Sequence, residues 1–262
     1  MTELNVNALN AIDRETDTIP VFARWIGSWR VSVRRKALGA EELAGRYDRA
    51  APGWRRTVRR FGYPDAYRAA LRRVLTARPD LAARGPLRAL DCGAGAGDLS
   101  LALVSAAAGP VTLSAVDISP RMLAEAQARC VAAGASVTTR QADARDLPYM
   151  DGTFDLVMSA HMAEHLPAPE AAVREMARVV RPGGVLVLCV MRPSWFGAFV
   201  QVKWRTHAAP PHRAARWLEA AGLRKIEVAP LVPHGAAGRF SLVCVGEKPY
   251  DHCKDGAPRC NR

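Results

Sequence analysis

The sequence predicts an α/β domain in which helices cover both faces of a mostly parallel sheet. Three observations support this fold class. A short apolar segment at 87–91 reads as a buried strand, and it runs into a loop with alternate glycines. A helical pattern begins at Leu99, and strands and helices then alternate to about residue 190. With 262 residues and 49% hydrophobic residues, the chain is long enough to bury a sizeable core.

The segment before this domain is predicted to be helical. Residues 1–20 show no clear period, and residues 21–38 place large apolar side chains at helical spacing with arginines between them. The expected basic amphipathic helix either packs on the domain or lies at a membrane interface. A further helix is expected at 64–78. We therefore divide the chain into a helical extension and lid at 1–84, a domain at 85–248 with an insertion at 192–210, and a polar tail at 249–262.

The glycine loop after the first strand is suited to holding a ligand. Gly93, Gly95 and Gly97 permit positive φ angles and let a ligand approach the backbone without meeting a Cβ. A dinucleotide loop would read G-x-G-x-x-G, but Asp98 stands where its last glycine would be. Asp91 adds a second carboxylate. Two carboxylates repel phosphate and favour a ligand that carries an amino group or another positive charge.

The second predicted strand, at 111–116, ends at Asp117. Its distance of about 20 residues from the glycine loop is what a βαβ unit needs to place a carboxylate beside a ribose diol. A helix at 119–133 follows and stops at Gly134.

The remaining elements follow the same alternation. Strands are expected at 136–141 and 154–159, a helix at 170–180, a turn at the R-P-G-G sequence of 181–184, and a strand at 185–191. The insertion at 192–210 is aromatic and basic, which suits a substrate with an acidic or phosphate-bearing part; its aromatic residues could equally pack against the N-terminal helix. A helix at 211–221 and strands at 226–228 and 240–245 complete the pattern.

Taken in order, these motifs resemble the class I S-adenosylmethionine-dependent methyltransferases. The likeness covers residues 87–190 and includes the glycine loop, Asp117, the D-A-x-D-L-P string at 143–148, the E-H-L sequence at 164–166 and the R-P-G-G turn. The resemblance implies a seven-stranded, mostly parallel Rossmann-like sheet with an antiparallel last strand and an N-terminal helical lid. It also implies S-adenosylmethionine as cofactor and S-adenosylhomocysteine as product.

The resemblance assigns roles to particular residues. Asp143 would meet the adenine amine, and the backbone N–H of Ala144 would meet a ring nitrogen. The candidate cofactor-binding residues are Asp91, Gly93, Gly95, Gly97, Asp117, Ile118, Met122, Asp143, Ala144 and Ser159.

Two residues are candidates for the methyl-transfer step. Tyr47, in a Y-D-x-x-A-x-x-W segment, would close over the cofactor, or it is a packing residue of an ordinary helix. His161 would orient the substrate or accept a proton, or it only bonds a neighbouring backbone group. Glu164 and His165 are interpreted as structural residues of a short helix.

Charge and cysteines narrow the possible partners. The net charge of +12 suggests nucleic acid, an anionic membrane or an acidic substrate. Because the basic residues are spread along the chain, we expect no nucleic acid partner. The six cysteines form no disulfide framework, and the tail residues Cys253 and Cys260 match no zinc pattern, so no metal is predicted. Lacking a long apolar run or a signal-peptide pattern, the sequence predicts a cytoplasmic protein.

The sequence thus predicts in-line transfer of a methyl group to an O, N or S atom of a small molecule. An alternative is a methyltransferase that acts at a membrane surface on a phospholipid head group or another lipid, with peripheral contact through residues 21–38. A nucleic-acid methyltransferase is the third hypothesis. The sequence predicts neither the accepting atom nor the oligomeric state.

Overall fold

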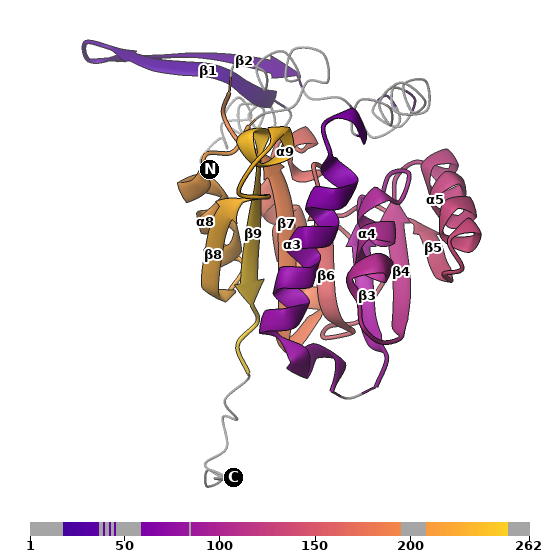
Figure 1. The fold of residues 1–262 in the computed structure, drawn as a ribbon. Helices are drawn as coiled ribbons and strands as arrows, with labels where there is room; N and C mark the ends of the chain where they lie inside the picture. The colour runs from indigo at the N-terminus through magenta and orange to yellow at the C-terminus, as the bar shows by residue number, and fades with distance from the viewer. Residues whose placement is uncertain are drawn as a thin grey trace, which may run out of the picture.

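A computed structural model describes residues 18–36, 59–83, 85–194 and 208–250, together with residues 39, 42 and 45. Within this part of the chain, seven strands form one sheet and two more form a separate hairpin. Figure 1 shows the sheet between two layers of helices, with the hairpin at one end of the molecule.

The strands of the sheet are apolar runs bounded by turns. In chain order they are β3 (Leu87–Cys92), β4 (Val111–Asp117), β5 (Val137–Gln141), β6 (Phe154–Ala160), β7 (Val180–Met191), β8 (Arg224–Pro230) and β9 (Ser241–Glu247). Their order across the sheet is β5-β4-β3-β6-β7-β9-β8, and β9 runs antiparallel to both neighbours. The predicted seven-stranded, mostly parallel sheet with an antiparallel last strand is confirmed.

Alternating side chains of each strand supply two separate cores. On one face, α3 (Tyr63–Ala77), α4 (Asp98–Ala106), α5 (Pro120–Ala132) and the short α9 (Ala236–Phe240) cover the sheet. On the other, α6 (Pro169–Val179) and α8 (Pro211–Ala220) pack against it. Two short 3₁₀ turns, η1 (Pro79–Ala82) and η2 (Ala163–His165), complete the described elements. The predicted α-helices at 64–78, 119–133, 170–180 and 211–221 are all present, with small shifts at their ends.

The point where the strand order reverses lies between β3 and β6. From β3 the chain continues to β4 on one side, and β6 pairs with β3 on the other. In open sheets of this kind, ligands bind outside the carboxyl ends of the strands at such a point. The glycine loop follows β3 directly, so the fold places it there.

The predicted helix over residues 21–38 is wrong. The chain forms a hairpin of β1 (Thr18–Ile26) and β2 (Trp29–Lys36), in which Ile26 pairs with Trp29 across a Gly27–Ser28 turn. Gly27 has a φ of 60°, as two-residue hairpin turns require. Apolar and polar residues alternate from 29 to 34, and this period of two matches a strand. Residues 18–36, which were predicted to belong to a helical lid, therefore form a β-hairpin instead.

The R-P-G-G turn is an irregular step inside a strand. Phe154 pairs with Val180 and Leu156 pairs with Val185, so the six residues 180–185 of β7 lie opposite the three residues 154–156 of β6. Gly183 has a φ of 75° at this step. In place of the predicted turn at 181–184, the structure has a register irregularity within β7, and the strand continues through it.

Several predictions lie outside the described residues. They concern Tyr47, most of the insertion at 192–210, and Cys253 and Cys260 in the tail. Across the described ranges, no helix is long and apolar enough to cross a membrane. The same ranges contain no group of His, Cys, Asp and Glu side chains arranged to hold a metal ion.

Candidate functional site

The glycine loop is tied to the end of β4 and leaves space above its centre. The N–H groups of Gly93 and Ala94 both donate to the carbonyl of Val116, at 2.8 and 3.0 Å. Gly93, Gly95 and Gly97 all have positive φ angles, of 72°, 50° and 81°. A Cβ on Gly93 would lie 2.5 Å from Cγ of Met162, whereas a Cβ on Gly95 would meet no atom of the described residues within 4 Å. Gly93 thus permits close packing, and Gly95 leaves an open surface for a ligand.

Asp91 places a buried carboxyl group beside this loop. Its Oδ2 accepts a hydrogen bond of 2.6 Å from the hydroxyl of Ser100. Its Oδ1 is buried and has no hydrogen-bond partner among the described residues. Burial raises the pKa of Asp91 to about 7; the Ser100 hydrogen bond opposes this shift and the charge of Asp117 adds to it. A buried acceptor without a partner is a place for a donor group of a ligand.

Asp117 lies where the sequence predicted the ribose-binding carboxylate. Its Oδ2 accepts from the N–H of Gly95 at 2.8 Å, and its Oδ1 accepts from the N–H of Ser119 at 2.9 Å. These two bonds fix the carboxylate against the loop. Each oxygen has a further lone pair, so both can accept from a diol as well.

Three more predicted residues lie at or just beyond the carboxyl ends of β4 and β6. The carbonyl of Ile118 accepts from Nε2 of Gln141 at 2.9 Å, and Met122 is buried in the first turn of α5. Ser119 caps that helix, because its hydroxyl accepts from the N–H of Met122 at 3.1 Å. Ser159 lies at the end of β6, buried, and its Oγ has no partner among the described residues.

Asp143 is paired with a residue that the sequence analysis did not consider. Nη2 of Arg145 lies 2.7 Å from Oδ2 of Asp143, and the N–H of Arg145 donates to Oδ1 at 2.8 Å. The Arg145 hydrogen bond lowers the pKa of Asp143. An adenine amine would share this carboxylate with Arg145. Ala144, next to it, is buried.

Asp98 was predicted to repel phosphate, but its negative charge is paired with an arginine. Nη2 of Arg129, on α5, lies 2.6 Å from Oδ1 of Asp98, and Nη1 of Arg129 donates to the carbonyl of Ala96. Arg129 therefore compensates Asp98. Of the two carboxylates predicted to repel phosphate, only Asp91 has no cationic partner among the described residues.

His161 is held by side chains and not only by backbone groups. Its Nδ1 lies 3.0 Å from Oε1 of Glu164, and its Nε2 lies 3.5 Å from Oγ of Ser241. Glu164 is buried, and its Oε1 also accepts from the N–H of Met191 at 2.5 Å. Burial tends to raise the pKa of Glu164, but the His161 ring and the Met191 N–H outweigh it, so the pKa is lowered. Glu164, expected to be only structural, is thus a partner of the candidate catalytic residue.

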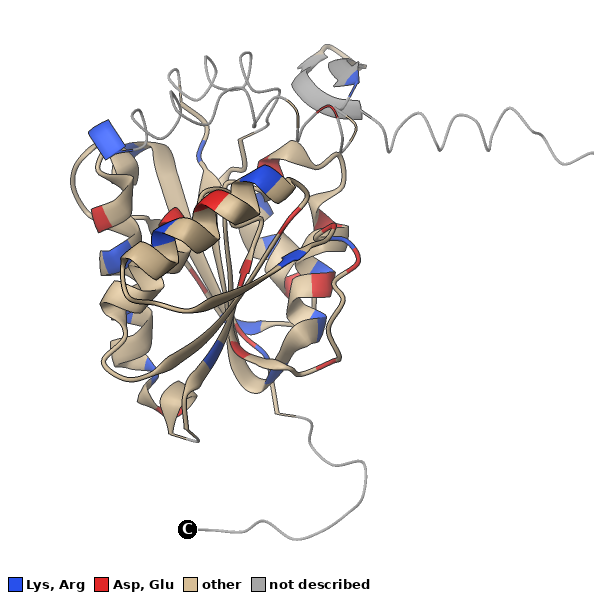
Figure 2. Ribbon diagram, turned by 90° about the vertical axis from the view of Figure 1, so that its right-hand side faces the viewer, with Lys and Arg blue, Asp and Glu red and all other residues tan. Residues whose placement is uncertain are grey.

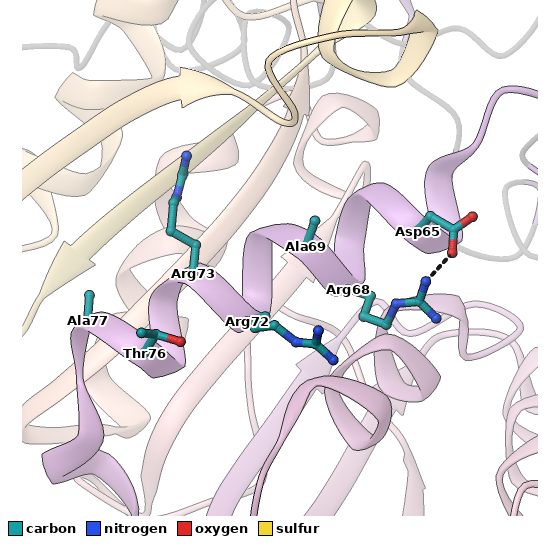
Figure 3. A pocket seen from close by; sticks show the side chains of 7 residues that line it. All are labelled: Asp65, Arg68, Ala69, Arg72, Arg73, Thr76 and Ala77. Carbon is teal, nitrogen blue, oxygen red and sulfur yellow. Dashed lines mark hydrogen bonds and ion pairs between the residues drawn. The ribbon is translucent and has the colours of Figure 1, made fainter.

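A hollow elsewhere on the surface is lined, among the described residues, by side chains of α3 (Figure 3). It contains Arg68, Arg72 and Arg73, and Arg68 pairs with Asp65 at 2.6 Å. None of the predicted cofactor-binding residues lines it.

Comparison with known proteins agrees with this geometry. Residues 90–188 match the family described as a methyltransferase domain. The chain is 41% identical over 116 residues to demethylmenaquinone methyltransferase of Thermus thermophilus, covering 44% of this chain and 52% of that protein. It is 34% identical over 167 residues to ajmaline N-methyltransferase of Rauvolfia serpentina, covering 56% of this chain and 57% of that protein. The chain thus spans about half the length of these relatives.

A solved S-adenosylmethionine-dependent methyltransferase of Thermotoga maritima has the same fold. It superposes with a TM-score of 0.60 at 19% identity, covering 79% of this chain and 99% of that one.

The residues at the carboxyl ends of the strands fit the cofactor of this class. S-adenosylmethionine carries a cationic amino group, a ribose diol and an adenine. Such groups suit Oδ1 of Asp91, the fixed carboxylate of Asp117 and the surface at Gly95, where the described residues leave the oxygen without a partner and the glycine uncovered. Residues 90–188 therefore match the methyltransferase domain family, in a chain with the fold of an S-adenosylmethionine-dependent methyltransferase.

Proposed function

We propose that the protein transfers a methyl group from S-adenosylmethionine to an O, N or S atom of a small organic molecule. The observation that carries the proposal is the arrangement of Asp91, Gly95 and Asp117 around an open loop at the switch point of the sheet. The names of two relatives, a demethylmenaquinone methyltransferase and an ajmaline N-methyltransferase, support a small-molecule acceptor.

The protein's own residues supply binding and orientation. Gly93–Gly97 and Asp117 would hold the amino-acid and ribose parts, and Asp143 with Ala144 the adenine. The bound cofactor supplies an electrophilic methyl group on a sulfonium, so in-line approach of the acceptor is the main requirement. His161, at the carboxyl end of β6 and 18% exposed, is available to orient the acceptor or take its proton. Tyr47 remains our candidate for closing over the site.

Transfer of labelled methyl tests this function. Protein is incubated with methyl-labelled S-adenosylmethionine and an extract of the host cells, and the products are separated into polar metabolites, lipids, protein and RNA. We expect label among the small molecules. Label confined to protein or RNA, or no label in any fraction, would contradict the proposal.

The hairpin favours a second candidate, in which the enzyme works at a membrane surface on a phospholipid head group or another lipid. Ile26, Trp29 and Val31 are 61%, 77% and 44% exposed. The hairpin lies at the end of the molecule where the parallel strands finish (Figure 1). Its sequence contains five basic residues and no acidic one: Arg24, Arg30, Arg34, Arg35 and Lys36. Exposed tryptophan and basic residues together suit the interface of an anionic bilayer.

Vesicle sedimentation tests this candidate. We expect binding to phosphatidylglycerol vesicles, weaker binding to phosphatidylcholine vesicles, and release by salt. Trp29→Ser should weaken binding. Met150→Ser is the matched control, because Met150 is 82% exposed but lies in the turn before β6. Equal binding of both variants, or no binding of the unmodified protein, would remove this candidate.

A further inference from the structure

Four side chains from distant parts of the sequence form a hydrogen-bonded chain at the carboxyl end of the sheet. The hydroxyl of Tyr63 lies 2.8 Å from Oγ of Ser241, and that Oγ lies 3.5 Å from Nε2 of His161. On the other side of the ring, Nδ1 of His161 lies 3.0 Å from Oε1 of Glu164. Tyr63, Ser241 and Glu164 are buried, and His161 is the one member with partial exposure. Of these four hydrogen-bonded side chains, His161 is therefore the one that a substrate can reach.

The hydrogen bonds of this chain have a defined direction. A carboxylate only accepts hydrogen bonds, and Oε1 of Glu164 accepts from the Met191 N–H at 2.5 Å as well as facing His161. Nδ1 of His161 therefore carries the proton, and Nε2 of the neutral ring carries the lone pair. At the other end, burial raises the pKa of Tyr63 to about 12, so Tyr63 keeps its proton. The Ser241 hydroxyl can then accept from Tyr63 and donate to Nε2 of His161.

The backbone holds His161 in an unusual conformation beside the glycine loop. Its φ is 56°, a region that costs a residue with a side chain about 1–3 kcal/mol. Its N–H donates to the carbonyl of Cys189 at 2.9 Å, and the ring of Tyr63 meets the imidazole edge-on, with centroids 5.5 Å apart. The next residue, Met162, packs against Gly93. Strain kept at one residue by several contacts is typical of functional positions.

We propose that Glu164, Ser241 and Tyr63 are positioning residues that present Nε2 of His161 as a proton acceptor. The methyl acceptor is then a molecule whose attacking atom carries a proton, such as a phenolic or enolic hydroxyl or an ammonium group. This inference rests on the proposed function. It adds the class of acceptor and three residues that the sequence analysis did not assign to the reaction.

The step balances without another reactant. Nε2 of His161 takes the proton of the attacking atom, and the resulting imidazolium lies beside the Glu164 carboxylate. The lone pair on the attacking atom forms the bond to the methyl carbon, and the carbon–sulfur bond breaks with its electron pair left on sulfur. The Ser241 contact of 3.5 Å is at the long limit for a hydrogen bond, so the acceptor's hydroxyl can replace it.

The tautomeric state of the His161 ring tests directly whether its neighbours present Nε2 as a proton acceptor. Ring nitrogens of the full-length ¹⁵N-labelled protein are observed by NMR with S-adenosylhomocysteine present, and the His161 signals are assigned by their loss in His161→Gln. We expect a protonated Nδ1 and an unprotonated Nε2 in the neutral ring, and a mixture of tautomers in Glu164→Gln. A protonated Nε2 in the unmodified protein would overturn the proposal.

Kinetics of transfer into the extract test the same residues. Glu164→Gln and Ser241→Ala should each lower the rate at saturating S-adenosylmethionine about tenfold or more, with the cofactor Kd unchanged. Ser241→Thr keeps the hydroxyl and should restore most of the rate. Thr153→Val is the control, because its hydroxyl bonds the Met150 carbonyl at the opposite end of β6. Unchanged rates in Glu164→Gln and Ser241→Ala would contradict the proposal.

The labelled product tests the acceptor class. A methyl ether, a methyl thioether or an N-methylated amine supports the inference. A sulfonium or quaternary product made from a thioether or tertiary amine would overturn it, because no proton leaves in that reaction. If no label is transferred at all, the proposed function fails, while the NMR result still decides whether the chain of hydrogen bonds sets the tautomer.

Discussion

At the scale of single residues, a substitution at Gly95 distinguishes a glycine needed for the backbone conformation from one needed for ligand binding. Gly95 and Gly134 have φ angles of 50° and 75°, and within the described part of the chain a Cβ on either would meet no atom within 4 Å. Alanine at either position should therefore cost a similar 1–2 kcal/mol, roughly, of stability. Gly95→Ala should also weaken S-adenosylmethionine binding about tenfold or more, because its methyl group enters the open surface. Thermal melting and binding titrations check this, and equal affinity in both variants would argue against the cradle.

Asp91 should make cofactor binding depend on pH. Burial raises its pKa from 3.8 to about 7, so the folded protein holds a proton there that the unfolded chain releases between these values. This residue's contribution to stability is thus favourable at low pH and is lost as the pH rises toward 7. A cationic amino group favours the carboxylate. The affinity for S-adenosylhomocysteine should therefore rise from pH 6 to pH 8, by about tenfold per pH unit at most.

Asp91→Asn is the control for this pH dependence. It should bind more weakly at pH 8 and show a flatter pH profile, as measured by calorimetric titration. A profile as steep as that of the unmodified protein would assign the dependence to another group.

For single residues, the sequence predicts which residue types form the site, but it does not predict which side chains they contact. Glycines after a strand and a carboxylate at a fixed interval follow from the βαβ geometry, so Gly95 and Asp117 lie where they were expected. The Arg129 that compensates Asp98 is 31 residues away, and Ser241 is 80 residues from His161. Such contacts depend on how α5 and β9 pack, which no local pattern encodes.

At the scale of elements, the R-P-G-G motif joins β7 to β6 at the end away from the cofactor. Nε of Arg181 lies 2.5 Å from Oδ1 of Asp155, and both side chains are buried. A Cβ on Gly184 would lie 2.8 Å from the carbonyl of Asp155, which explains the second glycine. The R-P-G-G motif is therefore easily recognised in the sequence for structural reasons, although it takes no part in methyl transfer.

Removing one partner of this buried pair should destabilise the fold and spare the site. Asp155→Ala leaves the Arg181 charge buried without its carboxylate, at a cost of roughly 3–5 kcal/mol in the free energy of unfolding. Asp151→Ala is matched to it: this carboxylate pairs with Arg178 at 2.8 Å but is 79% exposed, so we expect a loss of about 1 kcal/mol at most. Urea unfolding measures both. Equal losses would contradict the structural role given to Arg181.

The hairpin shows why a helical period alone misled. Phe22, Trp25, Trp29 and Val33 fit helical spacing, but Gly27–Ser28 interrupts that pattern with a two-residue turn. Strands in the sheet were easier to predict, because their apolar runs are short and bounded by turns. The five-residue α9 has too few residues to show a period, and the sequence gives no sign of it.

At the scale of the whole molecule, the fold concentrates polar groups at one edge. The carboxyl ends of β3, β4 and β6 bring Asp91, Asp117 and His161 together, although they are up to 70 residues apart in the chain, as their residue numbers show. Figure 2 shows basic and acidic residues interspersed over the described helices and strands. The expectation of no nucleic acid partner accords with this distribution and stays a prediction.

Equilibrium binding of S-adenosylmethionine to the unmodified protein and to Asp117→Ala tests the central claim most directly. We expect one bound cofactor per chain. The variant should bind about 10–100-fold more weakly, because hydrogen bonds to a charged group contribute roughly 1.5–3 kcal/mol. Thermal melting confirms that the variant is folded. No binding by the unmodified protein, or equal affinity in a folded Asp117→Ala variant, would contradict the site described here.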